Sequence, residues 1–257
     1  MSEPVWKVVK GNGPIVATAI HSGHDVRPDV RKLFAISKDD RLREEDPYTG
    51  DWAVIAPTHI IGLRSRFEVD LNRPRDKSVY IQPEDAWGLK IWKHQPTDKL
   101  IKTSLEEYDE FYSELRHILS EIESRYGRFV VFDLHSYNHR RKGPESQPED
   151  AKRNPEVNLG TGTMNRELWA AVVARFMNDL RKFDFGGRRL DVRENVKFRG
   201  GQLSRWVDEN YPETGCSLSI EFKKFFMDEW TGQLYPEEHQ RIKDALKSTV
   251  IGVLEEL

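Results

Sequence analysis

The segment at residues 128–140, RFVVFDLHSYNHR, constrains the fold of this chain more than any other. Four consecutive apolar residues, 129–132, together with Leu134 are typical of a strand buried on both faces, as in a parallel or mixed sheet. The apolar run stops at His135, where a polar, basic stretch begins. Ligands bind beyond the carboxyl ends of the strands in open α/β sheets. We therefore expect His135 to end the strand and face a ligand; the alternative is a hydrogen-bonded structural histidine.

A second apolar run also ends on a histidine. Residues 13–20, GPIVATAI, predict a strand that is followed by His21 and, three residues later, by His24. Pro28 then suits the first turn of a short helix. If the two strands are neighbours, His21 and His135 lie a few ångströms apart. The alternative is that His21 or His24 caps the helix.

The composition limits the class of protein. The 257 residues contain no low-complexity linker and predict one domain, residues 1–257. The 40 basic residues nearly balance the 43 acidic ones, which argues against a nucleic-acid binder. The chain has neither an apolar run of the roughly 20 residues that span a bilayer nor a signal-peptide pattern at its start, so we expect a cytoplasmic protein without a membrane segment.

A single cysteine, Cys216, excludes an internal disulfide and a multi-thiolate metal site. Any metal must then take His, Asp or Glu ligands. The acidic stretch at residues 39–51 contains Glu44, Glu45 and Asp46. A solvated loop is the default interpretation of this stretch, but a zinc site with two histidines usually takes a carboxylate as its third ligand.

The remaining pattern alternates strands and helices. Apolar residues predict strands at 59–63, 67–71, 156–160 and 216–222, and helical spacing predicts helices at 104–126, 165–182 and 236–257, with a further helix opened by Gly200 and Gly201. Ser104 and Glu107 match a capping box, and Gly127 matches a helix C-cap. Residues 142–155 predict a mobile loop beside the site, a candidate lid.

Two sets of polar residues flank these strands. Arg66, Asn72 and Arg73 surround the predicted strand at 67–71, and clustered guanidinium groups suit an anionic substrate, although surface solubility is the simpler interpretation. Glu221 shares a strand face with small residues, Ser217 and Ser219. It either pairs with a basic residue or acts as a base beside a metal.

Six segments, in order from His21 to Glu229, resemble the N-formylglutamate amidohydrolase family: HSGHDVRP, SRFEVDLNRP, DLHSYN, NPEVNLGT, FRGGQLSRW and SIEFKKFFMDE. More distantly, their order is similar to that of zinc carboxypeptidases and aspartoacylase-type deacylases. The resemblance implies an α/β fold: a three-layer α/β/α sandwich with a mixed central sheet and a carboxypeptidase-like core. It also implies one zinc ion.

The resemblance further implies roles for particular residues. His21 and His135 would hold the zinc, with a third ligand from Glu45 or Asp46; Asp46 is preferred, and His24 competes for the same position. Glu221 would act as base, with Arg66 or Arg205 stabilising the oxyanion. The substrate-binding residues would be Asn72, Arg73 and Ser136.

The leading hypothesis is a zinc-dependent amidohydrolase that cleaves the amide of a small, anionic acyl-amino acid. The main rival is a binding module that keeps the fold and holds such a ligand without hydrolysis. Glu221 favours the enzyme, because a binding module has no need of a base. A peptidase is a weaker third hypothesis, since no extended apolar pocket for side chains is evident.

Overall fold

The structure is a computed structural model that describes residues 4–257. Its centre is a seven-stranded sheet with the strand order β1-β3-β2-β4-β7-β5-β6. The strands are β1 (Trp6–Val9), β2 (Ile15–Ala19), β3 (Thr58–Gly62), β4 (Phe129–Tyr137), β5 (Val157–Gly160), β6 (Val192–Glu194) and β7 (Gly215–Lys223). β1 is antiparallel to β3, β5 is antiparallel to β7, and the other neighbours are parallel. The sheet is therefore mixed, as predicted.

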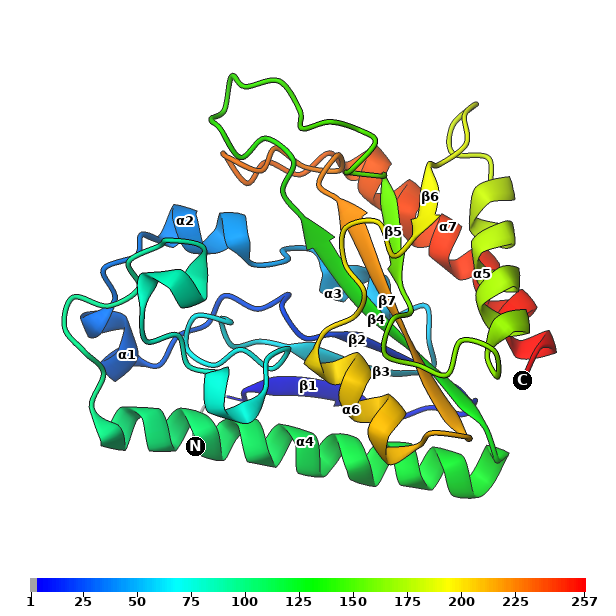
Figure 1. The fold of residues 1–257 in the computed structure, drawn as a ribbon, viewed down its shortest axis with the longest axis horizontal. Helices are drawn as coiled ribbons and strands as arrows, with labels where there is room; N and C mark the ends of the chain where they lie inside the picture. Colours follow the sequence, from blue (N-terminus) through cyan, green and yellow to red (C-terminus); the bar gives the residue numbers. More distant parts are fainter. Residues whose placement is uncertain (1–3) are drawn as a thin grey trace.

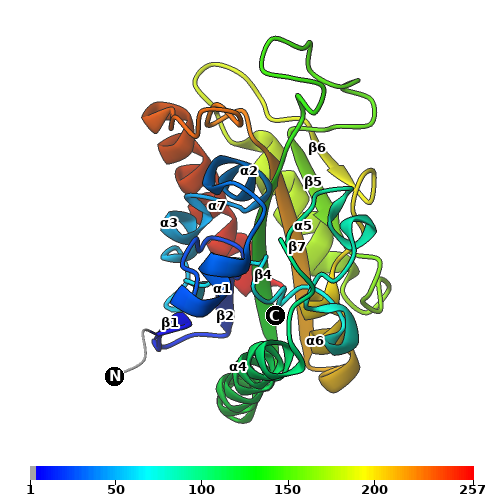
Figure 2. The ribbon, with the colours of Figure 1, turned by 90° about the vertical axis from the view of Figure 1, so that its left-hand side faces the viewer.

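Helices cover both faces of the sheet (Figures 1 and 2). The helices are α1 (Pro28–Leu33), α2 (Lys38–Glu44), α3 (Thr49–Ala53), α4 (Asp98–Tyr126), α5 (Ala170–Lys182), α6 (Gln202–Asn210) and α7 (Pro236–Glu255), with short 3-10 turns η1 (Arg75–Lys77) and η2 (Pro83–Ala86). Alternate β4 side chains enter two cores: Val130 and Phe132 pack with α3, α5 and α7, whereas Phe129 and Val131 pack with α4 and α6. This confirms the three-layer α/β/α sandwich.

The central pair of strands places the two predicted histidines. β2 and β4 are parallel neighbours, so both run towards the same sheet edge. His21 follows two residues after β2. His135 lies inside β4, because this strand continues to Tyr137 through main-chain pairing with β7. The prediction that the strand ends at His135 was wrong: backbone pairing does not require apolar side chains.

The capping box predicted for the longest helix was also wrong. α4 begins at Asp98, and the Thr97 side chain accepts a hydrogen bond from the Leu100 amide at 3.3 Å. Ser104 is buried within the helix and accepts a bond of 2.9 Å from Arg27. Gly127 is confirmed as the C-cap, with a φ of 77° that favours glycine.

Two predicted segments differ in conformation. Residues 67–71 form turns instead of a strand, since the Glu68 amide bonds to the Ser65 carbonyl and the Asp70 amide to the Ser78 carbonyl. The acidic stretch at 39–51 folds into α2 and α3, and Glu44, Glu45 and Asp46 are buried instead of solvated. Each carboxylate also has a partner from a distant segment: Arg141 for Glu44, Ser65 for Glu45 and His135 for Asp46.

The segment at residues 142–155 has no helix or strand and belongs to the long loop after β4 at the top of Figure 1. Its second half is fixed: the Glu149 amide donates to the His139 carbonyl at 2.7 Å, and Arg193 donates to the Lys152 carbonyl at 2.8 Å. Its role as a lid stays a prediction. Within residues 4–257, no helix has both the length and the apolar composition needed to cross a membrane.

Candidate active site

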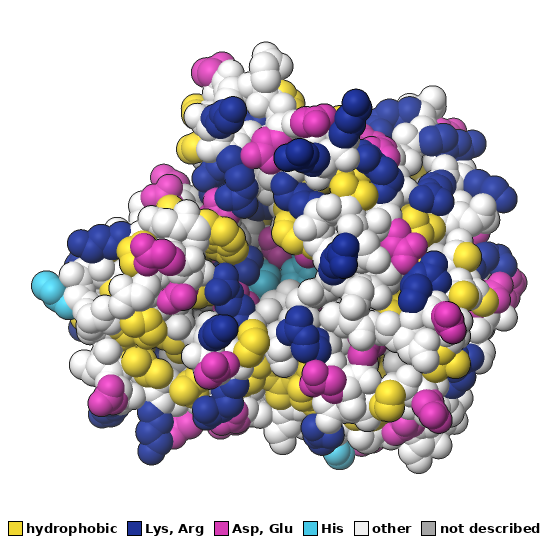
Figure 3. Space-filling view, in the orientation of Figure 1, with side chains coloured by type: hydrophobic (Ala, Val, Ile, Leu, Met, Phe, Trp, Pro, Cys, Tyr) yellow, Lys and Arg dark blue, Asp and Glu magenta, His cyan; other side chains and the backbone are white. Residues whose placement is uncertain are grey.

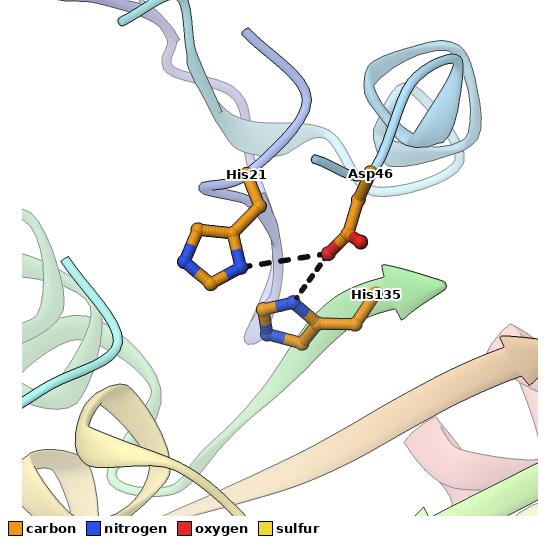
Figure 4. Close-up of side chains that lie close together, drawn as sticks. All are labelled: His21, Asp46 and His135. Carbon is orange, nitrogen blue, oxygen red and sulfur yellow. Dashed lines mark hydrogen bonds and ion pairs between the residues drawn. The ribbon is translucent and has the colours of Figure 1, made fainter. Parts of the chain in front are cut away.

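Three side chains converge at the edge of the sheet reached by β2 and β4 (Figure 4). Asp46 Oδ2 lies 3.0 Å from His135 Nδ1 and 3.5 Å from His21 Nδ1. One ligand atom from each of the three residues lies within 4.8 Å of the others, and all three side chains are buried. The set of two imidazole nitrogens and one carboxylate oxygen is one that zinc accepts at catalytic sites, where its fourth position stays open.

A carboxylate contacts the second ring nitrogen of each histidine. His21 Nε2 lies 2.7 Å from Asp70 Oδ1, and His135 Nε2 lies 3.1 Å from Asp133 Oδ2. Metal-binding histidines almost always direct their other nitrogen to such a partner, which fixes the ring and increases its basicity. The donor set and its surroundings therefore fit a metal ion.

The electrostatics of the cluster favour positive charge at this position. Burial lowers the pKa of His135, but Asp133 and Asp46 more than offset burial and raise this pKa well above its usual value. Burial acts to raise the pKa of Asp46, yet His135 and His21 hold it well below its usual range. Protons on the imidazoles or a bound cation can supply this charge.

Of the three candidates for the third ligand, only Asp46 belongs to the cluster. Asp46 is held between α2 and α3, where its amide donates to the His21 carbonyl at 2.9 Å. Glu45 points elsewhere: its Oε2 lies 2.7 Å from His24 Nδ1, and Ser65 donates to its Oε1. Glu45 and His24 thus pair with each other, and neither belongs to the cluster.

The cluster lies at the floor of a cavity of about 360 Å³. Figure 3 shows the hollow in the middle of one face, with histidine at its base and basic side chains near its rim. Five basic residues line it: Arg66, Arg141, Lys197, Arg199 and Lys224. Acidic groups are fewer, namely Glu44, Asp46 and Glu221. Such a cavity suits a small anionic ligand.

Glu221 reaches the cavity from β7, directly opposite His135 in the strand register. Burial raises its pKa to about 7; His135 lowers it, whereas Asp46 and Asp133 raise it further. Within residues 4–257, no protein group donates a hydrogen bond to its carboxylate. The carboxylate is therefore available to water or to a ligand.

The two arginines proposed for the oxyanion differ in position. Arg66 lines the cavity, donates to Asp70 Oδ2 at 2.8 Å and stacks over Trp87. Arg205 is exposed, donates to Gln202 and lines a separate pocket. Arg205 lies away from the cluster because α6 directs Leu203 and Val207 to the core and leaves this position on the outer side.

The predicted substrate-binding residues are mostly engaged by the protein. Asn72 lines the cavity, but its Oδ1 accepts the Leu203 amide at 3.0 Å. Ser136 donates to Asp46 Oδ1 at 3.3 Å. Arg73 is not among the residues that line the cavity; its guanidinium lies 4.7 Å from the centre of the Tyr80 ring. Of the predicted carboxylate clamp, Asn72 therefore lines the cavity with its side-chain oxygen engaged, and Arg73 lies outside the cavity lining.

Sequence reasoning missed several residues around the site. Asp70 and Asp133 hold the imidazoles. Asp133 could have been found from the sequence, because residues two apart on a strand, such as Asp133 and His135, point to the same face. Lys224 is 1% exposed and donates to the carbonyls of Arg43 at 2.6 Å and Glu45 at 2.7 Å. It thereby fixes the backbone on either side of Glu44, just before Asp46.

Fold and site together define an α/β protein with a candidate metal centre of two histidines and one aspartate. The sequence matches the family model for N-formylglutamate amidohydrolase over residues 13–227. The chain belongs to the N-formylglutamate amidohydrolase family, as its motifs predicted. No curated protein gives a significant match.

Two solved structures share the fold. One is the N-formylglutamate amidohydrolase from Ralstonia eutropha JMP134, with a TM-score of 0.77 and 18% identity over 98% of this chain and 97% of that chain. The other is a gene product of Agrobacterium tumefaciens, with a TM-score of 0.72 and 15% identity over 99% and 96%. At these identities the likeness supports the fold alone.

Proposed function

We propose that this protein is a zinc-dependent amidohydrolase that cleaves the linear amide of an acylated acidic amino acid, such as N-formylglutamate. The observation that carries the proposal is the position of Glu221, a carboxylate without a protein donor, across the strand register from His135 of the candidate metal set. Family membership and the cationic cavity support the same class of reaction and substrate.

His21, Asp46 and His135 are the residues that would hold the zinc ion. Zinc in such a site lowers the pKa of a water molecule and polarises a carbonyl group. Asp70 and Asp133 orient the two imidazoles, and Ser136 orients Asp46. The donor atoms are thus fixed before a ligand arrives, as an active site requires.

Glu221 is proposed as the proton carrier. The oxygen of water bonds to the acyl carbon, the carbon–nitrogen bond breaks, and the products are a carboxylate and an amine. Glu221 accepts a proton from water and passes it to the leaving nitrogen. Its pKa of about 7 suits both steps near neutral pH, because a base is most effective when its pKa is close to the working pH.

Arg66 is proposed to stabilise the oxyanion that develops on the acyl oxygen. Its guanidinium is held by Asp70 and by the Glu44 carbonyl, 3.3 Å from Nη1, so it need not reorganise during the reaction. Burial lowers its pKa, but Asp70 and Tyr80 raise it well above its usual value. Arg66 is therefore cationic throughout the reaction.

The direct test is a screen of formyl-, acetyl- and succinyl-amino acids for amine release by the zinc-loaded protein. Release from an acylated acidic amino acid, in preference to the neutral ones, is the expected result. Binding of these compounds without any release would contradict hydrolysis and support the rival function, a binding module of the same fold.

A further inference from the structure

The basic residues of the cavity are not equally available to a ligand. Arg66 and Arg141 contact carboxylates, Lys197 contacts Glu149 and Asn154, and Lys224 donates to backbone carbonyls. Arg199 differs: within residues 4–257, its side chain has neither an ion pair nor a hydrogen bond. It nevertheless lines the cavity that contains the candidate metal set.

The backbone before Arg199 is fixed by a buried amide. Asn158 on β5 accepts the Lys197 amide at 2.8 Å and donates to the Phe198 carbonyl at 2.9 Å. Asn158 also pairs with Glu221 in the strand register. The segment that carries Arg199 is therefore tied to the strand position opposite the proposed base.

The backbone at and after Arg199 is fixed as well. The Arg199 carbonyl accepts the Gly162 amide at 2.7 Å, and a Cβ on Gly162 would lie 2.8 Å from the Arg199 Cβ, so glycine is needed for this approach. Further on, Asn72 accepts the amides of Gln202 at 3.1 Å and Leu203 at 3.0 Å. A rigid backbone thus presents a guanidinium without a protein partner.

We infer that Arg199, instead of Arg73, binds a carboxylate of the substrate and determines the preference for an anionic acyl-amino acid. A guanidinium matches a carboxylate through two parallel N–H donors, which gives geometric selectivity as well as charge. Because its backbone is already ordered, little backbone freedom is lost on binding. This inference rests on the proposed function and identifies the anionic subsite of the same cavity.

The test compares Arg199→Met, Arg199→Lys and the control Arg205→Met, whose arginine lies outside the cavity. Formate release is measured for N-formylglutamate and for its diamide, in which both carboxylates are neutral amides. Arg199→Met should raise KM for N-formylglutamate about 10- to 100-fold with little change in kcat, as loss of a charge-assisted hydrogen bond predicts. The KM of Arg199→Lys should lie between those of the parent and Arg199→Met, and the KM of Arg205→Met should match that of the parent.

Calorimetry of N-formylglutamate binding to the same proteins tests the anionic subsite at Arg199 separately from the proposed hydrolysis. If the parent binds but does not hydrolyse it, and Arg199→Met weakens binding, the anionic subsite is supported while hydrolysis is not. If Arg199→Met leaves hydrolysis of N-formylglutamate unaffected, or raises KM equally for the diamide, the role of Arg199 is overturned. The proposed hydrolysis would still stand. Absence of both binding and hydrolysis in the parent would overturn both.

Discussion

His135 on β4 and Glu221 on β7 are directly paired residues of adjacent parallel strands. The pairing sets one side chain in the candidate metal set and the other at the cavity wall, so the sheet itself fixes their relative position. A rigid sheet is better suited than a loop to hold reacting groups in a productive geometry.

The first prediction concerns metal content. The purified protein should contain about one zinc per chain, and His135→Ala should lose it, because two protein ligands are too few for such a site. His24→Ala is the matched control: His24 pairs with Glu45 outside the cluster and its loss should leave the zinc in place. Elemental analysis measures the zinc content of each variant. Zinc retained in His135→Ala would contradict the assignment of His135 to the zinc site.

A second prediction concerns Asp133, the carboxylate behind His135 of the candidate metal set. Asp133→Asn keeps the shape of the side chain but removes the charge beside His135 Nε2. Zinc affinity should fall by about 10- to 100-fold, the usual effect of losing such a partner. Competition with a coloured chelator measures the affinity. An unchanged value would mean that Asp133 does not orient His135.

A third prediction concerns Lys224. Lys224→Met keeps the length of the side chain but leaves the carbonyls of Arg43 and Glu45 without their buried donor. Each unsatisfied buried group costs about 1–3 kcal/mol, so the free energy of unfolding should fall by at least that amount. Urea denaturation measures it, with the exposed Lys247→Met on α7 as the control. Equal stability of the two variants would argue against the structural role.

A fourth prediction concerns stability and pH. Burial raises the pKa of Asp208 to about 7, although Thr163 donates a hydrogen bond to it. The native state therefore binds more protons than the unfolded state between pH 3.8 and about 7, and the free energy of unfolding should decrease as pH rises through this range.

Asp208→Asn removes this titration. The free energy of unfolding of the variant should match that of the parent near pH 4. At pH 8 it should be larger by roughly 1–4 kcal/mol, as the size of the Asp208 pKa shift indicates. Urea denaturation at several pH values gives the difference. A difference that does not change with pH would show that Asp208 ionises normally.

Sequence patterns located the elements of the site better than the contacts within it. The apolar runs before His21 and His135 and the small residues beside Glu221 correctly indicated three strands of one sheet, β2, β4 and β7. These signals are local, because alternation and strand length depend on neighbouring residues. The family resemblance, and not a local pattern, favoured Asp46 over Glu45.

The errors concern side-chain contacts that depend on tertiary packing. Ser104 matched a helix cap, but Arg27, 77 positions earlier, uses its hydroxyl. Arg73 looked available to a substrate, but Tyr80 and Asp70 occupy its surroundings. Whether an arginine is free or engaged depends on tertiary packing, and no local pattern distinguishes Arg199 from Arg205.

The central claim is that Glu221 carries the proton in a metal-dependent hydrolysis. Glu221→Gln keeps the shape of the side chain but cannot accept a proton, so the variant should fold, retain zinc and bind N-formylglutamate. The decisive measurement is kcat for formate release by zinc-loaded Glu221→Gln, with exposed Glu209→Gln as the control. The account predicts a fall of about 10²- to 10⁴-fold in Glu221→Gln alone; an unchanged kcat in that variant would contradict it.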